Sequence, residues 1–174
     1  MAVKNPSPKR GMLRVAILTV SDRSSRGERP DRSGPALVEA VTSNGWQVVS
    51  TEIVPDETVA IQACLLEWSK ADVIDLVLTT GGTGFAPRDI TPEATQAVIE
   101  RAAPGLAEAM RAESLKITSH AMLSRGIAGI RGRTLIINLP GSPKAAVENL
   151  ATIQSVLPHA IELLQEDPSA ENNH

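Results

Sequence analysis

The chain has 174 residues, of which 42% are hydrophobic and 21% charged, and this balance is typical of one globular domain with a full core. A formal net charge of −3 at pH 7 argues against a general binder of nucleic acid or membrane surfaces. Only 2% of the residues are aromatic, so the core must be aliphatic and no surface for stacking nucleic-acid bases is expected.

Both ends of the chain are polar, and we predict flexible segments there. They are an N-terminal lead-in at residues 1–11 and a C-terminal tail at residues 167–174, on either side of a single domain at residues 12–166. Arg14 interrupts the first apolar run, which therefore predicts a strand rather than a signal peptide. No stretch is long and apolar enough to cross a bilayer, so we expect a cytoplasmic protein.

Apolar runs and helical patterns alternate along the chain. Strands are predicted at residues 14–20, 46–54, 73–78 and 134–139, and helices at residues 35–43, 58–69, 92–102, 104–116 and 143–164, the last one kinked or divided at Pro158. A tight turn at residues 131–133 indicates that residues 127–130 form a short antiparallel strand. This alternation predicts an α/β fold with a mainly parallel sheet covered on both faces. Cys64, the only cysteine, is predicted to be a core residue of the second helix.

Glycine, proline and charged residues gather directly after the four main strands. The segments are residues 21–34, 55–57, 79–89 and 140–144. The carboxyl ends of parallel strands share one edge of a sheet, where open α/β proteins bind their ligands. We therefore expect these four segments to form one binding site.

The glycine loop, residues 79–84, reads Thr-Thr-Gly-Gly-Thr-Gly. Such loops let backbone N–H groups close on an anion, and the helix that follows adds its positive dipole end. We expect Thr91 to be the N-cap of that helix and Pro92 its first residue. The loop favours phosphate binding, with a simple tight turn as the alternative, and its glycine spacing fits neither a P-loop nor the dinucleotide fingerprint.

Two carboxylates in these segments suggest a metal. Asp89 lies between the glycine loop and the helix start, where it would repel a phosphate unless a cation bridged them. Mg²⁺ takes one or two carboxylates together with phosphate oxygens, so Asp89 and Asp56 predict a magnesium–nucleotide site. The alternatives are an Arg88–Asp89 surface pair and a purely structural Asp56 that caps the next helix.

Several further residues of these segments have two interpretations each. Ser142 is expected to cap the last helix, which places Lys144 in the first turn, where it either binds an anion or extends into solvent. Ser33 is interpreted as a helix cap first and as a ligand group second. A loop with four arginines is either a solvated charged segment or an anion-binding lid, and these arginines are Arg23, Arg26, Arg29 and Arg32.

Four blocks of the sequence resemble the MogA/MoaB family of molybdenum-cofactor biosynthesis proteins. The most specific is Thr-Gly-Gly-Thr-Gly at residues 80–84, followed by Arg-Asp-Ile-Thr-Pro-Glu-Ala at residues 88–94. The other blocks lie at residues 17–22, 30–34 and 139–143, and the resemblance covers about residues 14–164. It implies a three-layer α/β/α fold of the MogA/MoaB type and a homotrimer.

The resemblance also implies an activity. Family members transfer AMP from ATP to molybdopterin, which gives adenylyl-molybdopterin and pyrophosphate with Mg²⁺, and the product passes to a MoeA-type molybdate-inserting partner. The alternative is a non-catalytic molybdopterin-binding or scaffolding protein of the same pathway, of the MoaB type.

The candidate site combines the residue-level reasoning with the resemblance. Asp56 and Asp89 match family residues important for adenylyl transfer and are the expected catalytic residues and Mg²⁺ ligands. The Ser124-Arg125 pair fits a family pattern without an assigned role. Contacts with ATP or molybdopterin are expected from Ser21, Asp22, Ser33, Thr80, Gly81, Gly82, Thr83, Gly84, Arg88, Gly141, Ser142 and Lys144.

Overall fold

The computed structural model describes residues 12–70 and 72–166, so the flexible segments predicted at residues 1–11 and 167–174 lie outside the described residues. Its strands form one sheet in the order β2-β1-β3-β6-β5-β4. The first four strands in this order are mutually parallel, whereas β5 runs antiparallel to β6, and β4 to β5. The bounds are β1 Arg14–Val20, β2 Gln47–Val54, β3 Leu76–Thr80, β4 Arg101–Ala102, β5 Ala128–Arg131 and β6 Thr134–Leu139.

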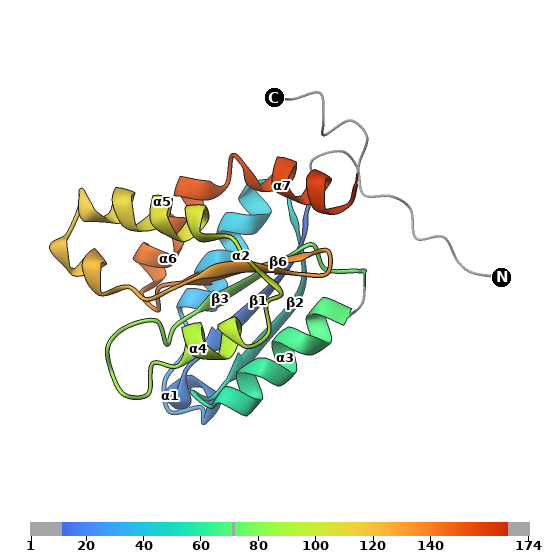
Figure 1. Ribbon diagram of the computed structural model, residues 1–174. Helices are drawn as coiled ribbons and strands as arrows, with labels where there is room; N and C mark the ends of the chain where they lie inside the picture. The colour runs from blue at the N-terminus through green and yellow to red at the C-terminus, as the bar shows by residue number, and fades with distance from the viewer. Residues whose placement is uncertain (1–11, 71, 167–174) are drawn as a thin grey trace.

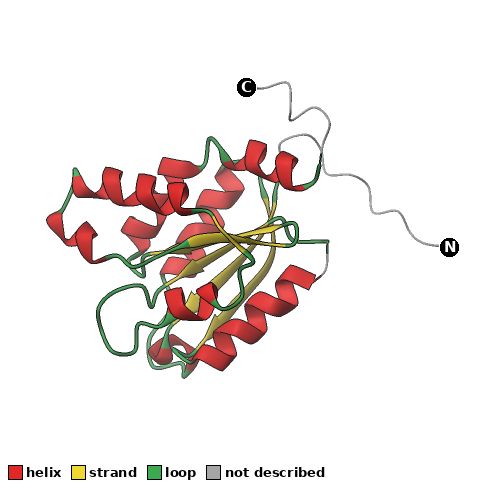
Figure 2. Cartoon of the chain, viewed as in Figure 1, coloured by secondary structure: helices red, strands yellow, loops and turns green. Residues whose placement is uncertain are grey.

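Helices cover both faces of this sheet, which confirms the predicted three-layer α/β/α fold (Figures 1 and 2). One face packs against α2, α5, α6 and α7, and the other against α3 and α4. The helices are α1 Asp22–Ser25, α2 Ser33–Ser43, α3 Thr58–Lys70, α4 Thr91–Gln96, α5 Pro104–Leu115, α6 Pro143–Ile153 and α7 Leu157–Leu164, with a 3₁₀ helix, η1, at Ser119–Leu123.

Three of the four apolar runs become strands that are buried on both faces, namely β1, β3 and β6, whereas β2 at the edge of the sheet is partly exposed. In β1, Val15 and Ile17 join the core under α2 and α6, while Ala16 and Leu18 join the core under α3 and α4. Alternation of side chains along a strand explains why a continuous apolar run feeds two cores. The predicted division of the last helix is also confirmed, because α6 and α7 are separate and Pro158 lies in the first turn of α7.

The third strand begins later than predicted, at Leu76 rather than at residue 73. Asp75 precedes it and is buried, with its carboxylate accepting hydrogen bonds from the Arg14 backbone N–H at 2.8 Å and from Arg14 Nη2 at 2.7 Å. This ion pair fixes the entry to the strand. The strand also ends later than predicted, because Thr79 and Thr80 belong to β3, so the loop itself begins at Gly81.

The prediction of a helix at residues 92–102 was wrong for the second half of this range. Helix α4 ends at Gln96, and the chain then pairs with β5, where the Glu100 N–H donates to Ile130 O at 2.8 Å. Gly129 permits this approach, because a Cβ atom there would lie 2.5 Å from Ile99 Cδ1. The backbone of β5 thus offers hydrogen-bond partners that a local helical pattern cannot anticipate.

Candidate active site

A cavity of about 670 Å³ lies at the carboxyl edge of the parallel strands, where the loops after β1, β2, β3 and β6 meet. This is the edge that the sequence predicts for a binding site. Most of the predicted site residues line the cavity, namely Ser21, Ser33, Asp56, Thr80, Gly81, Gly82, Asp89, Gly141 and Ser142. Residues from widely separated parts of the chain are therefore brought together as expected.

The glycine loop is held close to its neighbours. Gly81 has φ +102°, and a Cβ atom there would lie 2.3 Å from Val20 O. Gly82 has φ +66°, and a Cβ atom there would lie 2.3 Å from Thr91 Oγ1 and 3.2 Å from Asp56 Oδ1. Side chains at these positions would be strained and would collide with the loops around the cavity.

The predicted helix caps have mixed outcomes. Ser142 is the N-cap of α6, and its hydroxyl accepts a hydrogen bond from the Ala145 N–H at 3.5 Å. The N-cap of α4, however, is Ile90 rather than Thr91, because the Thr91 hydroxyl donates to Gly81 O at 2.9 Å instead. Thr91 therefore fastens the start of α4 to the glycine loop.

Ser33 is also not the cap that the sequence predicts. The N-cap of α2 is Arg32, and Ser33 donates its hydroxyl to Asp31 Oδ1 at 3.2 Å. The same Asp31 oxygen accepts the Gly34 N–H at 3.1 Å, so Asp31 satisfies the first turn of α2. Its other oxygen accepts from Thr19 Oγ1 at 2.7 Å and fastens the cavity wall to β1. This role of Asp31 was not predicted from the sequence. The available signal was its position three residues before Gly34, since a carboxylate at this spacing commonly accepts an N–H at the start of a helix.

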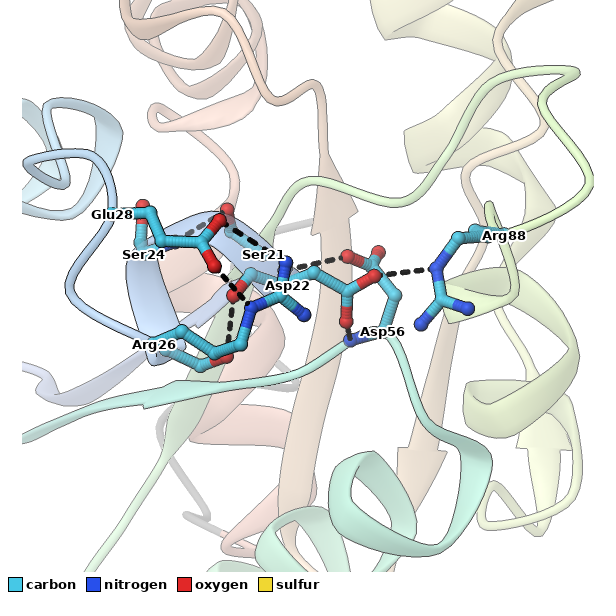
Figure 3. Close-up of polar contacts among 8 residues, drawn as sticks. Ser21, Asp22, Ser24, Arg26, Glu28, Asp56 and Arg88 are labelled. Carbon is cyan, nitrogen blue, oxygen red and sulfur yellow. Dashed lines mark hydrogen bonds and ion pairs between the residues drawn. The ribbon is translucent and has the colours of Figure 1, made fainter.

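Asp56 and Asp22 hold each other through reciprocal hydrogen bonds (Figure 3). The Asp22 N–H donates to Asp56 Oδ2 at 2.9 Å, and the Asp56 N–H donates to Asp22 Oδ1 at 3.0 Å. Arg88 donates to the other oxygen of Asp22, so Arg88 pairs with Asp22 and not with Asp89. This hydrogen bond from Arg88 lowers the pKa of Asp22, whereas burial raises the pKa of Asp56.

Asp89 is the second predicted metal ligand that lines the cavity. Its Oδ2 atom accepts a hydrogen bond from the Ala86 N–H at 3.0 Å, which turns the side chain back across its own loop. After burial, the charges of Asp22 and, to a smaller extent, Asp89 also raise the pKa of Asp56, as expected for carboxylates near one another. Within residues 12–70 and 72–166 there is no group of three or more histidine, cysteine or acidic side chains that could hold a metal ion.

The loop with four arginines is divided between two environments. Arg29 and Arg32 line the cavity, as the anion-binding interpretation requires, whereas Arg26 pairs with Glu28 at 2.7 Å on the surface. Two guanidinium groups thus border the same space as the carboxylates of Asp31, Asp56 and Asp89. A phosphate-rich ligand with a bound cation would complement both charges.

Five predicted residues lie outside the lining of this cavity. Asp22 and Arg88 form the pair behind Asp56. Lys144 extends into solvent, with 80% of its side chain exposed, and approaches Glu148 at 3.7 Å. Thr83 and Gly84 face a second pocket instead.

The second pocket has a volume of about 280 Å³ and lies on the other side of the glycine loop. Its walls include Thr83 and Gly84 from that loop together with Ile117, Leu123 and Ser124. Its surface is mainly apolar, although polar side chains such as Arg111, Glu148 and Asn149 also line it. The segment at Ser124 is joined to the glycine loop by the Arg125 N–H, which donates to Thr83 O at 2.8 Å.

The fold and the site together define a class of protein, namely an α/β protein with a doubly covered sheet and a ligand cavity at its carboxyl edge. Residues 16–159 match the family model described as a probable molybdopterin binding domain, and the chain belongs to this family. Molybdopterin adenylyltransferase from Helicobacter pylori is 43% identical over 154 residues, which cover 87% of this chain and 88% of that protein.

Two further comparisons agree with this family. The crystal structure of the molybdopterin biosynthesis enzyme MoaB from Thermus thermophilus is 52% identical, covers 90% of this chain and 99% of that one, and superposes with a TM-score of 0.84. The molybdenum cofactor synthesis protein cinnamon of Drosophila melanogaster is 47% identical over 90% of this chain. This chain spans only 26% of cinnamon and, similarly, 23% of a Dictyostelium discoideum gephyrin.

Proposed function

We propose that this chain is a molybdopterin adenylyltransferase, which transfers AMP from ATP to molybdopterin and releases pyrophosphate. The observation that carries the proposal is the meeting of Asp56 and Asp89 with the glycine loop in one cavity. The names of similar proteins that cover nearly the same length support it.

The cavity suits a nucleotide in size and in chemistry. Its volume of about 670 Å³ lies within the range of roughly 300–1,000 Å³ that small-molecule sites occupy. Arg29 and Arg32 supply positive charge, and the N-terminus of α6 faces the cavity through Ser142 and Pro143. These groups would bind the phosphates of ATP without any protein nucleophile.

Asp56 and Asp89 suit a magnesium ion that is shared with a phosphate ligand, whereas Asp31 is already bonded to Thr19, Ser33 and Gly34. Mg²⁺ is usually bound through one or two carboxylates together with substrate phosphates, and Asp56 and Asp89 supply that number. Burial raises the pKa of Asp56, and a cation bound beside it would favour the charged form of this carboxylate. When bound, the ion would offset the charge that develops on the leaving pyrophosphate.

The chain itself would act by position rather than by covalent chemistry. A phosphate oxygen of molybdopterin would form a bond to the α-phosphorus of ATP, and the bond from that phosphorus to the bridging oxygen of pyrophosphate would break. The glycine loop would hold the phosphates, while Arg29 and Arg32 would stabilise their negative charge. The neighbouring pocket would take the pterin ring, with apolar groups such as Ile117 against its faces and polar groups such as Ser124 for its nitrogen and oxygen atoms.

The assembly, the partner and the setting of the protein are proposed separately from its activity. A homotrimer, delivery of the product to a MoeA-type partner, and a cytoplasmic setting remain predictions based on the family resemblance. Among the helices of the described residues, none has the length and apolar character that crossing a bilayer requires. Sedimentation analysis and co-purification with a MoeA-type protein would test the first two predictions.

The direct test measures pyrophosphate released from ATP and MgCl₂, with and without molybdopterin. The proposal predicts release that depends on molybdopterin and produces one adenylyl-molybdopterin for each pyrophosphate. If the protein binds molybdopterin but releases no pyrophosphate above the protein-free control, it is the non-catalytic pterin-binding protein instead. If it binds neither molybdopterin nor ATP, the assignment to this reaction is wrong in both forms.

A further inference from the structure

The sequence alone assigns no role to the Ser124-Arg125 pair, but the contacts of Arg125 in the structure indicate one. We propose that Arg125 is a positioning residue for adenylyl transfer: it holds the loop from Gly84 to Asp89 closed and thereby fixes the Asp89 carboxylate in the cavity. This inference rests on the proposed function, because it assigns Arg125 to the same reaction. Arg125 itself is absent from the lining of the cavity and acts through Asp89.

One guanidinium group bonds both ends of this loop. Arg125 Nε donates to Gly84 O at 2.7 Å, and Nη2 donates to Asp89 O. Nη1 forms an ion pair with Glu93 in the first turn of α4. A single planar group thus links two carbonyls of one loop to a carboxylate of the helix that follows. Gly84 and Arg125 are 41 residues apart in the sequence.

The loop that Arg125 closes has one further internal support for Asp89. The Ala86 N–H donates to Asp89 Oδ2 at 3.0 Å, and the Asp89 N–H donates to Ala86 O at 2.8 Å. Gly84 lies against the same carboxylate, since a Cβ atom there would be 2.8 Å from Asp89 Oδ2. Because these contacts span only six residues of an exposed loop, the anchor at its two ends decides whether the carboxylate stays in place.

Arg125 is itself anchored on the wall of the second pocket. Arg111, from α5, donates through Nη1 to Gly126 O at 2.9 Å and to Ser124 O at 3.4 Å. The segment at residues 124–126 is therefore fixed to a helix before it reaches the glycine loop. Both Arg111 and Ser124 line the second pocket, so the same segment borders that pocket and holds Asp89 in the first.

A purely structural arginine is available for comparison in the same chain. Arg131 donates to Val98 O at 2.9 Å and approaches Glu100 at 3.7 Å, so it also joins a carbonyl and a glutamate. Its side chain is 32% exposed, against 33% for Arg125. Neither Arg131 nor its partners line the cavity, which makes Arg131→Gln a matched control.

The experiment compares Arg125→Gln, Arg125→Lys and Arg131→Gln with the full-length wild-type chain. Amide hydrogen exchange over residues 84–93 reports the loop, and steady-state kinetics give kcat and the KM for ATP. We expect exchange in this segment to rise about tenfold in Arg125→Gln. We expect kcat to fall roughly 10- to 100-fold with the KM for ATP changed less than about threefold, because a misplaced group costs rate more than binding. Arg131→Gln should match the wild type in both.

Arg125→Lys separates geometry from charge and also covers the case in which Arg125→Gln does not fold. Lysine keeps the positive charge but cannot bond two carbonyls and a carboxylate with one rigid group, so this variant should stay impaired. Exchange and kcat at the wild-type level in Arg125→Lys would overturn the proposal, and so would faster exchange with unchanged kcat in Arg125→Gln. Exchange needs no turnover, so it tests the anchoring of Asp89 even if the wild type makes no pyrophosphate, an outcome that would refute the proposed function instead.

Discussion

Gly82→Ala is expected to destabilise the protein and to damage the cavity at the same time. The new alanine would have to adopt φ +66°, which costs about 1–2 kcal/mol for a residue with a side chain. Its Cβ would also lie 2.3 Å from Thr91 Oγ1 and displace the buried hydrogen bond from that hydroxyl to Gly81 O. Loss of such a bond costs about 1–3 kcal/mol, which gives a total of roughly 2–5 kcal/mol.

Gly45→Ala is the matched control, because Gly45 has φ +75° but no atom within 4 Å of the position of a Cβ. This variant should lose only the free energy of unfolding that the positive φ costs, about 1–2 kcal/mol. In thermal unfolding, each kcal/mol corresponds to about 2–4 °C in Tm for a chain of this size, so the two variants should be separable. Equal losses of Tm would refute the proposed collision with Thr91, and full turnover in Gly82→Ala would refute its effect on Asp56 Oδ1, 3.2 Å away.

Three further variants and modifications test separate parts of the structure. Asp89→Asn should lower pyrophosphate release by roughly 100-fold or more, because it removes a proposed ligand of the metal. The affinity for molybdopterin, measured by fluorescence titration, should stay within a few-fold of the wild-type value. Near-normal turnover would remove Asp89 from the mechanism. Asp75→Ala leaves the Arg14 guanidinium and Gln165 Nε2 without their shared acceptor and should cost about 3–5 kcal/mol in urea unfolding, so a loss below about 1 kcal/mol would contradict the structural role given to this pair. Burial raises the pKa of the Cys64 thiol to about 12, so the thiol stays protonated until well above neutral pH, and iodoacetamide at pH 8.5 should label the folded chain about a thousandfold more slowly than the urea-unfolded chain. Equal labelling rates would show that Cys64 is not in a closed core.

The sequence predicts well those features that depend on a local pattern. The run at residues 14–20 is apolar enough to identify a strand, and β1 has those bounds. Ser142 followed by Pro143 predicts a helix start, which is where α6 begins. The shared position of glycine and acidic residues after the parallel strands also predicts the edge where the cavity lies.

Features that depend on a distant partner could not be predicted in this way. Threonine is a common N-cap residue, but the Thr91 hydroxyl donates its hydrogen bond to Gly81 O instead. Arg88 stands beside Asp89 in sequence, yet its guanidinium reaches Asp22, 66 residues away. In both cases a tertiary hydrogen bond replaced the local one, since a buried or aligned partner outweighs a propensity of a few tenths to about one kcal/mol.

The loops around the cavity are fastened to one another and not only to their own strands. Asp22 and Asp56 join the loops after β1 and β2, and Thr80 Oγ1 donates to Pro140 O at 2.7 Å, which joins β3 to the loop after β6. A site made of independent loops would have to order itself when the ligand arrives, and that ordering would oppose binding. Cross-links of this kind place the dipoles and charges before the ligand binds, which is the condition under which electrostatic stabilisation of a transferring phosphoryl group is strongest. Hydrogen bonds between one protein group and another can therefore assist phosphoryl transfer without touching the ligand. They do so by holding the charged groups in place, which is the protein's main contribution in such a site.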